Sequence, residues 1–252
     1  MTPRRAFAAA VALLCVGAAR PVLVPDVSER QVQIVYSFTG ADLLLFGAIL
    51  YPRGRAPARP ADIAVVLKGP TQSILLREKR KVAGMWINAA SARFRSAPAF
   101  YAIATSRPLA SLVDAKTAAI YELGLASLQM SPASGAAPED LRRFEDGLVT
   151  LKRRAGLYVE NPAGVEISDG VLYRARIAIP ARVPVGRYEA ETYLIQDGHV
   201  VAGAVRDVRI GKSGFERFVA EAASRWPFAY GAVAVLVSLA IGWGAGTLFR
   251  RT

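Results

Sequence analysis

The chain has 252 residues, a formal net charge of +12 at neutral pH, and only one cysteine and one histidine. A single cysteine and a single histidine exclude the usual zinc-ligand sets and any disulfide within the chain. The surplus of basic residues would suit nucleic acid, but both ends of the sequence carry export and membrane signals, so we expect no nucleic-acid partner.

The first 19 residues (1–19) predict a signal peptide. The basic start MTPRR is followed by the apolar run AFAAAVALLCVGAA, and small residues precede Arg20. This order is typical of a secretory signal that is cleaved, and an uncleaved signal anchor is the alternative. Cys15 lies in the apolar run and would leave with the signal, so the mature chain would contain no thiol.

Residues 20–107 predict a periplasmic β-sandwich. Apolar and polar residues alternate in RQVQIVYSF, as in a half-buried strand, while the unbroken apolar run LLLFGAILY predicts a strand buried on both faces. The segments DIAVVLK, SILLREK, KVAGMWIN and AFYAIATS predict four more short strands. Short strands separated by regular turns favour a sandwich.

A basic turn in this segment is the first candidate site. Its members are Lys79, Arg80 and Lys81, with Arg93 and Arg95 close in sequence. If consecutive strands stack in order, these five side chains would form a cationic rim able to hold an anion or phospholipid headgroups. The alternative is a solvated basic surface without a ligand.

Residues 108–156 predict a helical segment. LASLVDAKTAAIYELGLASLQ has the pattern of one helix, and PEDLRRFEDGLVTLKRRAG has the pattern of a second. In the second helix, Pro138 suits the first helical position and Gly156 suits the exit. An apolar stripe along this helix predicts packing against the sheet; its members are Leu141, Phe144, Leu148 and Leu151.

Residues 157–211 predict a second β-rich segment with immunoglobulin-like strands. In VPVGRYEAETYLI a tyrosine follows a turn with proline and glycine. This resembles the tyrosine corner of immunoglobulin-like sandwiches, where the hydroxyl bonds back to the backbone. The strands VLYRARIAI and RYEAETYLI predict a hairpin that sets Arg174 and Arg176 opposite Glu189 and Glu191. The sequence leaves open whether the two strand-rich segments form one sandwich or two.

The C-terminal end predicts a membrane span. Residues 212–226 predict a juxtamembrane amphipathic helix that opens with a capping box of Ser213 and Glu216. Residues 227–249 then carry no charged side chain, and as a helix they would cover roughly 34 Å, which is enough to cross a bilayer.

The residues after the span predict the orientation of the chain. Arg250 and Arg251 form the short tail 250–252, as expected of a cytoplasmic flank. Together with an N-terminal signal, this predicts a single-pass protein of the bacterial inner membrane, with the bulk of the chain in the periplasm and the C-terminus in the cytoplasm. The bilayer itself is therefore one expected partner.

A small-residue pattern in the span is the second candidate site. Gly242 and Gly246 are four residues apart, so they share one side of the helix and would let another helix approach closely. This predicts a helix-pairing face. Since glycine is common in membrane spans, the alternative is a span without a pairing role.

The sequence carries no recognisable catalytic set. The only histidine, His199, follows Asp197-Gly198 in the predicted turn of a hairpin, and no nucleophile elbow or phosphate-binding loop accompanies it. We therefore expect no catalytic residue, no bound metal, no cofactor and no enzymatic activity. The alternative is an envelope enzyme that uses dispersed carboxylates.

Five segments resemble a family of single-span membrane proteins from alphaproteobacteria: FTGADLLLFGAIL, DIAVVLKGP, KRKVAGMWIN, APAFYAIATSRPL and GWGAGTLFRR. The resemblance covers nearly the whole chain. It implies membership and single-span topology, assigns no catalytic residues, and implies an exporter-type permease of the sulfite/taurine class as a partner.

Together these patterns predict a mainly β protein with a helical insertion: an immunoglobulin-like β-sandwich, or two, followed by one C-terminal transmembrane helix. The expected function is that of a membrane-anchored periplasmic accessory or binding module for another membrane protein. The alternatives are the envelope enzyme and a binder of anions or lipid headgroups.

Overall fold

The computed structural model describes residues 21–34, 40–52, 60–133, 138–212, 219 and 222–249. The predicted signal peptide, the capping box of Ser213 and Glu216, and the tail with Arg250 and Arg251 lie outside the described residues. Within the predicted juxtamembrane segment, residues 222–225 are helical.

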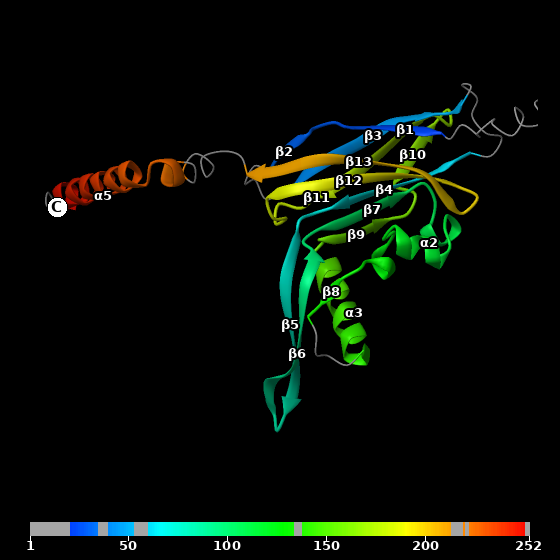
Figure 1. Cartoon of the computed structure of the whole chain (residues 1–252). Helices are drawn as coiled ribbons and strands as arrows, with labels where there is room; N and C mark the ends of the chain where they lie inside the picture. The colour runs from blue at the N-terminus through cyan, green and yellow to red at the C-terminus, as the bar shows by residue number, and fades with distance from the viewer. Residues whose placement is uncertain are drawn as a thin grey trace, which may run out of the picture.

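The described strands form two facing sheets and a smaller third sheet (Figure 1). In spatial order, the four-stranded sheet consists of β1 (Val22–Val27), β3 (Ala41–Leu50), β11 (Leu172–Ile179) and β10 (Val165–Ser168). The six-stranded sheet consists of β2 (Gln31–Ile34), β13 (His199–Lys212), β12 (Gly186–Gln196), β4 (Asp62–Lys68), β7 (Tyr101–Thr105) and β9 (Tyr158–Asn161). Most neighbours are antiparallel, whereas β2 beside β13 and β7 beside β9 are parallel.

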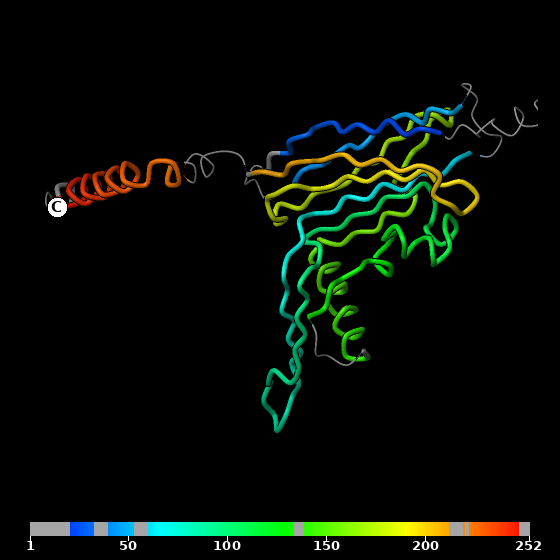
Figure 2. The backbone as a smooth tube through the Cα atoms, viewed as in Figure 1, coloured from blue at the N-terminus to red at the C-terminus, as the bar shows by residue number. Residues whose placement is uncertain are grey.

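The two strand-rich segments of the sequence form one sandwich. β3 pairs with β11, and β4 pairs with β12, so each sheet contains strands from both segments. The tube in Figure 2 shows the yellow C-terminal strands lying between the cyan and blue N-terminal ones. The boundaries at 107 and 157 therefore mark stretches of sequence within a single folded body.

The main core lies between these two sheets. Its largest fully buried side chains include Leu43 and Ile49 from β3, Tyr173 from β11, and Ile63 and Leu67 from β4. Burying each such side chain contributes about 1.5–3 kcal/mol. Contacts between residues from both segments thus hold the sandwich together.

The outer face of the four-stranded sheet is exposed. Side chains of β3 alternate between buried and accessible, with Phe46 39% and Leu50 54% exposed. The prediction that LLLFGAILY is buried on both faces is therefore wrong, because only one face of this sheet packs against another layer. β4 and β7 are strands that are buried on both faces.

A layer of short helical turns covers the other face of the six-stranded sheet. It consists of η2 (Leu109–Ser111), α2 (Ala115–Ile120) and η3 (Leu125–Ser127). The expected single helix is wrong here, because the backbone turns at Glu122 (φ +52°) and Gly124 (φ +89°). Leu112 and Leu123 of this layer pack with Tyr101 of β7 in a second core.

The third sheet is a long hairpin that projects from the sandwich (Figure 1). It consists of β5 (Thr71–Val82), β6 (Met85–Pro98) and the short β8 (Ser131–Pro132). KVAGMWIN was predicted as one strand, but the hairpin turn falls inside it, at Ala83 (φ +48°) and Gly84 (φ +86°). Positive φ at both central residues is the requirement of a type I′ hairpin turn.

The helix α3 (Pro138–Arg154) confirms the second predicted helix. Gly156, just beyond its end, has a φ of +66°, as expected where the chain turns out of a helix. Phe144 and Leu148 are buried, but they pack against the root of the hairpin. Leu151, which the stripe included, is 55% exposed.

The turn before β12 confirms the predicted tyrosine corner. The Tyr188 hydroxyl donates a 2.7 Å hydrogen bond to the carbonyl oxygen of Pro184, and the Tyr188 side chain is fully buried. Its ring packs at 6.1 Å from that of Phe100.

The predicted pairing of β11 with β12 is wrong, because the chain crosses from one sheet to the other between these strands. Arg174 lies opposite Glu166 of β10 and bonds to it at 2.6 Å. Glu191 instead meets Lys68.

The final described element is the helix α5 (Pro227–Phe249). None of the apolar window from Pro227 to Gly246 is buried against the rest of the chain, and the window is long and apolar enough to cross a membrane. The fold is thus mostly β, with a few helices between the strands and one C-terminal apolar helix, as the sequence predicts.

Candidate functional site

The projecting hairpin has a packed half and a free half. Near the sandwich, Ala92 and Phe94 of β6 are buried against Phe144 and Leu148 of α3. Beyond Glu78, every residue up to the turn and back to Asn88 is exposed. The helix therefore supports the root, and the tip stands in solvent.

Strand register places the basic residues of the tip. Lys79 lies opposite Asn88 and Lys81 lies opposite Trp86. Because directly opposed side chains of an antiparallel pair leave the same face, and alternate residues share a face, Lys79, Lys81 and Trp86 lie on one face of the hairpin. The register shifts between Glu78 and Lys79, where β6 carries one extra residue, while β5 continues to alternate, so Arg77 follows on the same face.

The same face continues toward the root with Arg93, which lies opposite Leu75. Three residues of the predicted rim, Lys79, Lys81 and Arg93, are thus brought together, and Arg77 joins them. Within the described part of the chain, none of these four side chains has an acidic partner.

Arg80 and Arg95 lie apart from this cationic face. Arg80 belongs to the opposite face, where its Nε lies 3.0 Å from Oε1 of Glu78. Glu78 also meets Arg143 of α3 at 3.1 Å, and the hydrogen bond from Arg80 holds the pKa of Glu78 below its usual range. Arg95 donates to the carbonyl oxygen of Pro132 at 3.3 Å, beside the root.

An apolar tip accompanies the cationic face, and the sequence analysis did not identify it. Val82, Met85, Trp86 and Ile87 are 50%, 67%, 69% and 44% exposed. Gly84 could have predicted this apolar tip, because a turn at this glycine places the residues on either side of it at the end of a hairpin.

The root of the hairpin and the chain that leads to α5 leave the same end of the sandwich. β12 begins at Gly186, which lies opposite Ile210 near the end of β13. A Cβ atom on Gly186 would lie only 3.2 Å from Cγ of Pro70, the residue that precedes β5. Figure 1 shows β5 and the end of β13 at the same end of the sheet.

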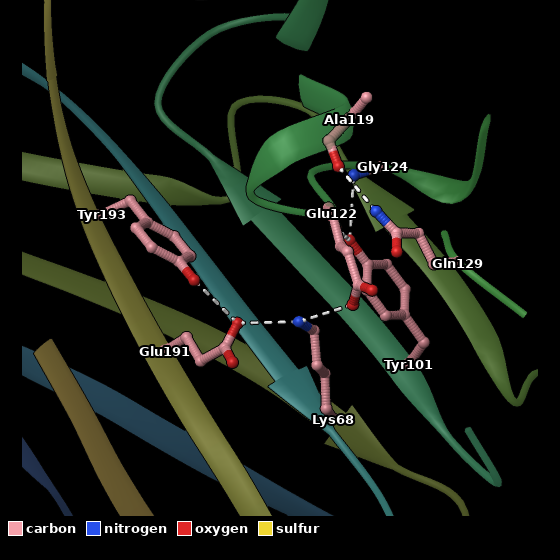
Figure 3. Close-up of polar contacts among 8 residues, drawn as sticks. All are labelled: Lys68, Tyr101, Ala119, Glu122, Gly124, Gln129, Glu191 and Tyr193. Atoms are coloured by element: carbon pink, nitrogen blue, oxygen red, sulfur yellow. Dashed lines mark hydrogen bonds and ion pairs between the residues drawn. The ribbon is translucent and has the colours of Figure 1, made fainter. Parts of the chain in front are cut away.

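A cavity of about 420 Å³ lies beside this root, lined by Lys68, Glu122, Gln129, Arg187 and Glu189 among others. In Figure 3 the Lys68 ammonium group lies between two carboxylates, 2.9 Å from Glu122 and 3.1 Å from Glu191. Burial alone would lower the pKa of Lys68, but the two carboxylates outweigh it and raise that pKa.

Further hydrogen bonds complete this charged network. The Tyr193 hydroxyl lies 3.0 Å from Oε2 of Glu191 and donates to it. The Tyr101 hydroxyl donates to the backbone oxygen of Glu122 at 2.8 Å and accepts from the amide of Gly124 at 2.9 Å (Figure 3). The network joins β4, β7, β12 and the turn at Glu122, so its contacts stabilise the fold.

A second cavity, of about 680 Å³, is lined by Asp62 and Arg107 among others. These two side chains form an ion pair, and hydrogen bonds from Arg107 and Ser106 lower the pKa of Asp62 despite its burial. Burial and the neighbouring Asp146 raise the pKa of Glu145. This residue lies on α3 and does not line either of these two cavities.

The described residues contain no group of three or more His, Cys, Asp and Glu side chains placed to hold a metal ion. His199 is exposed after the turn at Asp197-Gly198, and its Nδ1 lies 2.9 Å from the backbone oxygen of Asp197.

The predicted pairing face of α5 is open. A Cβ atom on Gly242 or Gly246 would meet nothing within 4 Å. At about 100° per residue, Ser238 extends the same side of the helix, whereas Gly244 lies on the opposite side. The Ser238 hydroxyl donates to the backbone oxygen of Ala234 at 2.8 Å, so its polar group is satisfied within the helix.

A family model described as "Putative transmembrane protein (Alph_Pro_TM)" matches residues 22–251. No curated protein matches the chain. Among solved structures, the N-terminal domain of the Streptococcus gordonii adhesin Sgo0707 is similar to 77% of this chain at 13% identity, with a TM-score of 0.25. The match spans only 33% of that chain, and at this TM-score the similarity establishes neither a shared fold nor a shared function.

Proposed function

The chain belongs to the Alph_Pro_TM family of transmembrane proteins, and on that premise we propose that it is a membrane-anchored accessory module of another membrane protein. Its sandwich is the working part and α5 is both anchor and pairing element. The module acts by binding and performs no catalysis of its own.

The open glycine face of α5 is the observation that carries this proposal. Packing between helices in a bilayer depends on close approach, because lipid tails are as apolar as the side chains they would replace. Gly242 and Gly246 offer that approach on one side of the helix, and nothing else in the described chain covers that side. A helix of the partner would fill it.

The orientation that we propose puts the sandwich in the periplasm and the C-terminus in the cytoplasm of a bacterium with an inner membrane. The basic flank of Arg250 and Arg251 and the signal-like first 19 residues support this orientation. The partner that the family resemblance suggests is an exporter-type permease, whose many spans would supply a complementary helix.

A binding role is favoured over catalysis by dispersed carboxylates. Three carboxylates at or beside the two cavities are ion-paired, Asp62 with Arg107 and both Glu122 and Glu191 with Lys68. A general acid would need a raised carboxyl pKa in such a cavity, whereas the pKa of Asp62 is lowered.

The test is purification of the tagged full-length chain in mild detergent, at its native expression level, with mass spectrometry of the proteins that accompany it. The wild-type chain should retain a polytopic membrane protein in near-equal amount. Replacing Gly242 and Gly246 with leucine should reduce that recovery about tenfold or more, because the added side chains hold the helices apart.

The matched control is Gly244→Leu, which adds one of the same side chains to the opposite side of α5. It should leave the recovery unchanged. Equal recovery with wild type and with G242L/G246L would show that this face does not bind the partner, and a preparation without any membrane protein would contradict the accessory role.

A further inference from the structure

We propose that the tip of the β5–β6 hairpin docks on the anionic phospholipid surface of the same bilayer that α5 enters. This site is separate from the helix face proposed above and needs no protein partner. The tip combines a cationic face with exposed apolar and aromatic side chains, which is the chemistry of the membrane interface.

The cationic face supplies the attraction. Arg77, Lys79, Lys81 and Arg93 share one face of the hairpin, and the nearest acidic residue in sequence, Glu78, points to the other face and is paired with Arg80. Each cation near an anionic leaflet strengthens binding about fivefold. Four of them on one face therefore strengthen binding about 600-fold if their effects multiply.

The apolar tip supplies the insertion. Trp86 and Met85 are the most exposed of the large apolar side chains of the hairpin, and Val82 and Ile87 flank them. Tryptophan favours the headgroup layer because its ring is apolar and its N–H can still bond to water or phosphate. A soluble surface has no need of such a cluster at the point farthest from the core.

The position of the hairpin makes this contact possible. Its root and the end of β13 lie at one end of the sandwich, so the tether to α5 and the hairpin leave in the same region. β6 has 14 residues, and so extends about 46 Å. From Lys212 to Ala222 the chain can reach up to about 35 Å, and residues 222–225 are helical, so a hairpin tilted toward the membrane can bring its tip to the bilayer.

Docking would give the sandwich two points of attachment. A single attachment through α5 does not fix how the sandwich faces the membrane, whereas a second contact at Trp86 does. The same end of the sandwich would then always face the bilayer.

The experiment uses Trp86 as its own probe. The chain has three tryptophans, so Trp226→Phe and Trp243→Phe leave Trp86 alone in the full-length protein. This protein is reconstituted in nanodiscs that contain brominated phosphatidylcholine, with or without phosphatidylglycerol. Bromine quenches tryptophan only on contact, so quenching reports the docked fraction.

Docking predicts that Trp86 emission moves to shorter wavelength and is quenched in discs with phosphatidylglycerol, and much less in discs of phosphatidylcholine alone. Lys79→Glu with Lys81→Glu should lower the ratio of docked to undocked protein about 30-fold or more. The control K116E/R176E makes the same change in charge at two exposed residues of α2 and β11, and should keep the quenching.

Quenching that is equal in the two kinds of disc, or absent from both, would overturn docking on anionic headgroups. Protection of Trp86 only after a co-purified membrane protein is added would assign the tip to that protein and would also overturn it. The comparison of the two kinds of disc is made without any partner protein, so its outcome does not depend on the pairing face of α5.

Discussion

The Tyr188 hydroxyl donates to the carbonyl oxygen of Pro184 over 2.7 Å, and this bond closes the turn through which the chain passes from one sheet of the sandwich to the other. The donor and the acceptor are four residues apart, while the ring of Tyr188 is fully buried in the core between the sheets. The bond therefore ties a local turn to the packing of the whole sandwich.

Tyr188→Phe removes this hydrogen bond and leaves the ring in place. We expect the free energy of unfolding to fall by about 1 kcal/mol, since a partly buried carbonyl loses its donor. Denaturant unfolding of the detergent-solubilised chain, followed by circular dichroism, measures the change. Tyr51→Phe is the control, because the Tyr51 hydroxyl has no partner among the described residues and its loss should change nothing.

Alkaline pH should destabilise the protein. Burial raises the pKa of six tyrosines: Tyr51, Tyr101, Tyr158, Tyr173, Tyr188 and Tyr193. In the unfolded chain each would ionise near pH 10, so their contribution to stability is complete below about pH 10 and is lost as the pH rises toward their folded values. The carboxylates around Lys68 act in the same direction, because they raise its pKa against the effect of burial.

Thermal unfolding between neutral pH and about pH 11 tests this dependence. The melting temperature should decline above about pH 10, and tyrosinate absorbance should appear together with unfolding. Burial lowers the pKa of Lys152, which acts in the opposite direction, but it is one group against the six tyrosines and Lys68. Ionisation of all the tyrosines near pH 10 in the folded chain would refute the expectation.

Leu148→Ala should loosen the hairpin without unfolding the sandwich. Leu148 is 3% exposed and packs with Phe94 at the hairpin root, so its truncation costs about 3 kcal/mol of local stability. Hydrogen exchange should accelerate in β5 and β6 and stay slow in β4 and β12. Leu151→Ala is the matched control on the same helix, because Leu151 is 55% exposed, and uniform acceleration would argue against an independent root.

A cysteine introduced at Arg182 tests the orientation of the chain. The sequence has one cysteine, Cys15, in the predicted signal peptide, and Arg182 is exposed on the sandwich. In intact spheroplasts, a membrane-impermeant maleimide should label Arg182→Cys as strongly as it does after lysis. Labelling that requires lysis would place the sandwich in the cytoplasm and reverse the topology.

Patterns local to one element predicted the fold best. The proline at the start and the glycine after the end predicted α3, and the long uncharged stretch predicted α5. The tyrosine after the turn predicted the hydrogen bond to Pro184. Each of these depends on neighbours a few residues away, so the sequence shows it directly. The predominance of strands and the C-terminal helix followed from the same patterns.

Strand pairing was harder to predict, because it depends on partners far apart in the chain. Glu191 meets Lys68, 123 positions away, and not the arginines of the preceding strand. The same limitation applies to the candidate rim, where alternation along β5 separates Arg80 from Lys79 and Lys81. The apolar tip depends on the position of the hairpin turn, which lies at Ala83 and Gly84 and not between two separate strands.

The most direct test of the accessory role is photocrosslinking within the membrane of living cells. A photoreactive amino acid at Val235 lies on the side of α5 that carries Gly242 and Gly246, and one at Val237 lies nearly opposite. Pairing predicts an adduct with one polytopic membrane protein from Val235 and little or none from Val237. No adduct from either position, or equal adducts from both, would contradict the pairing of α5 with a partner.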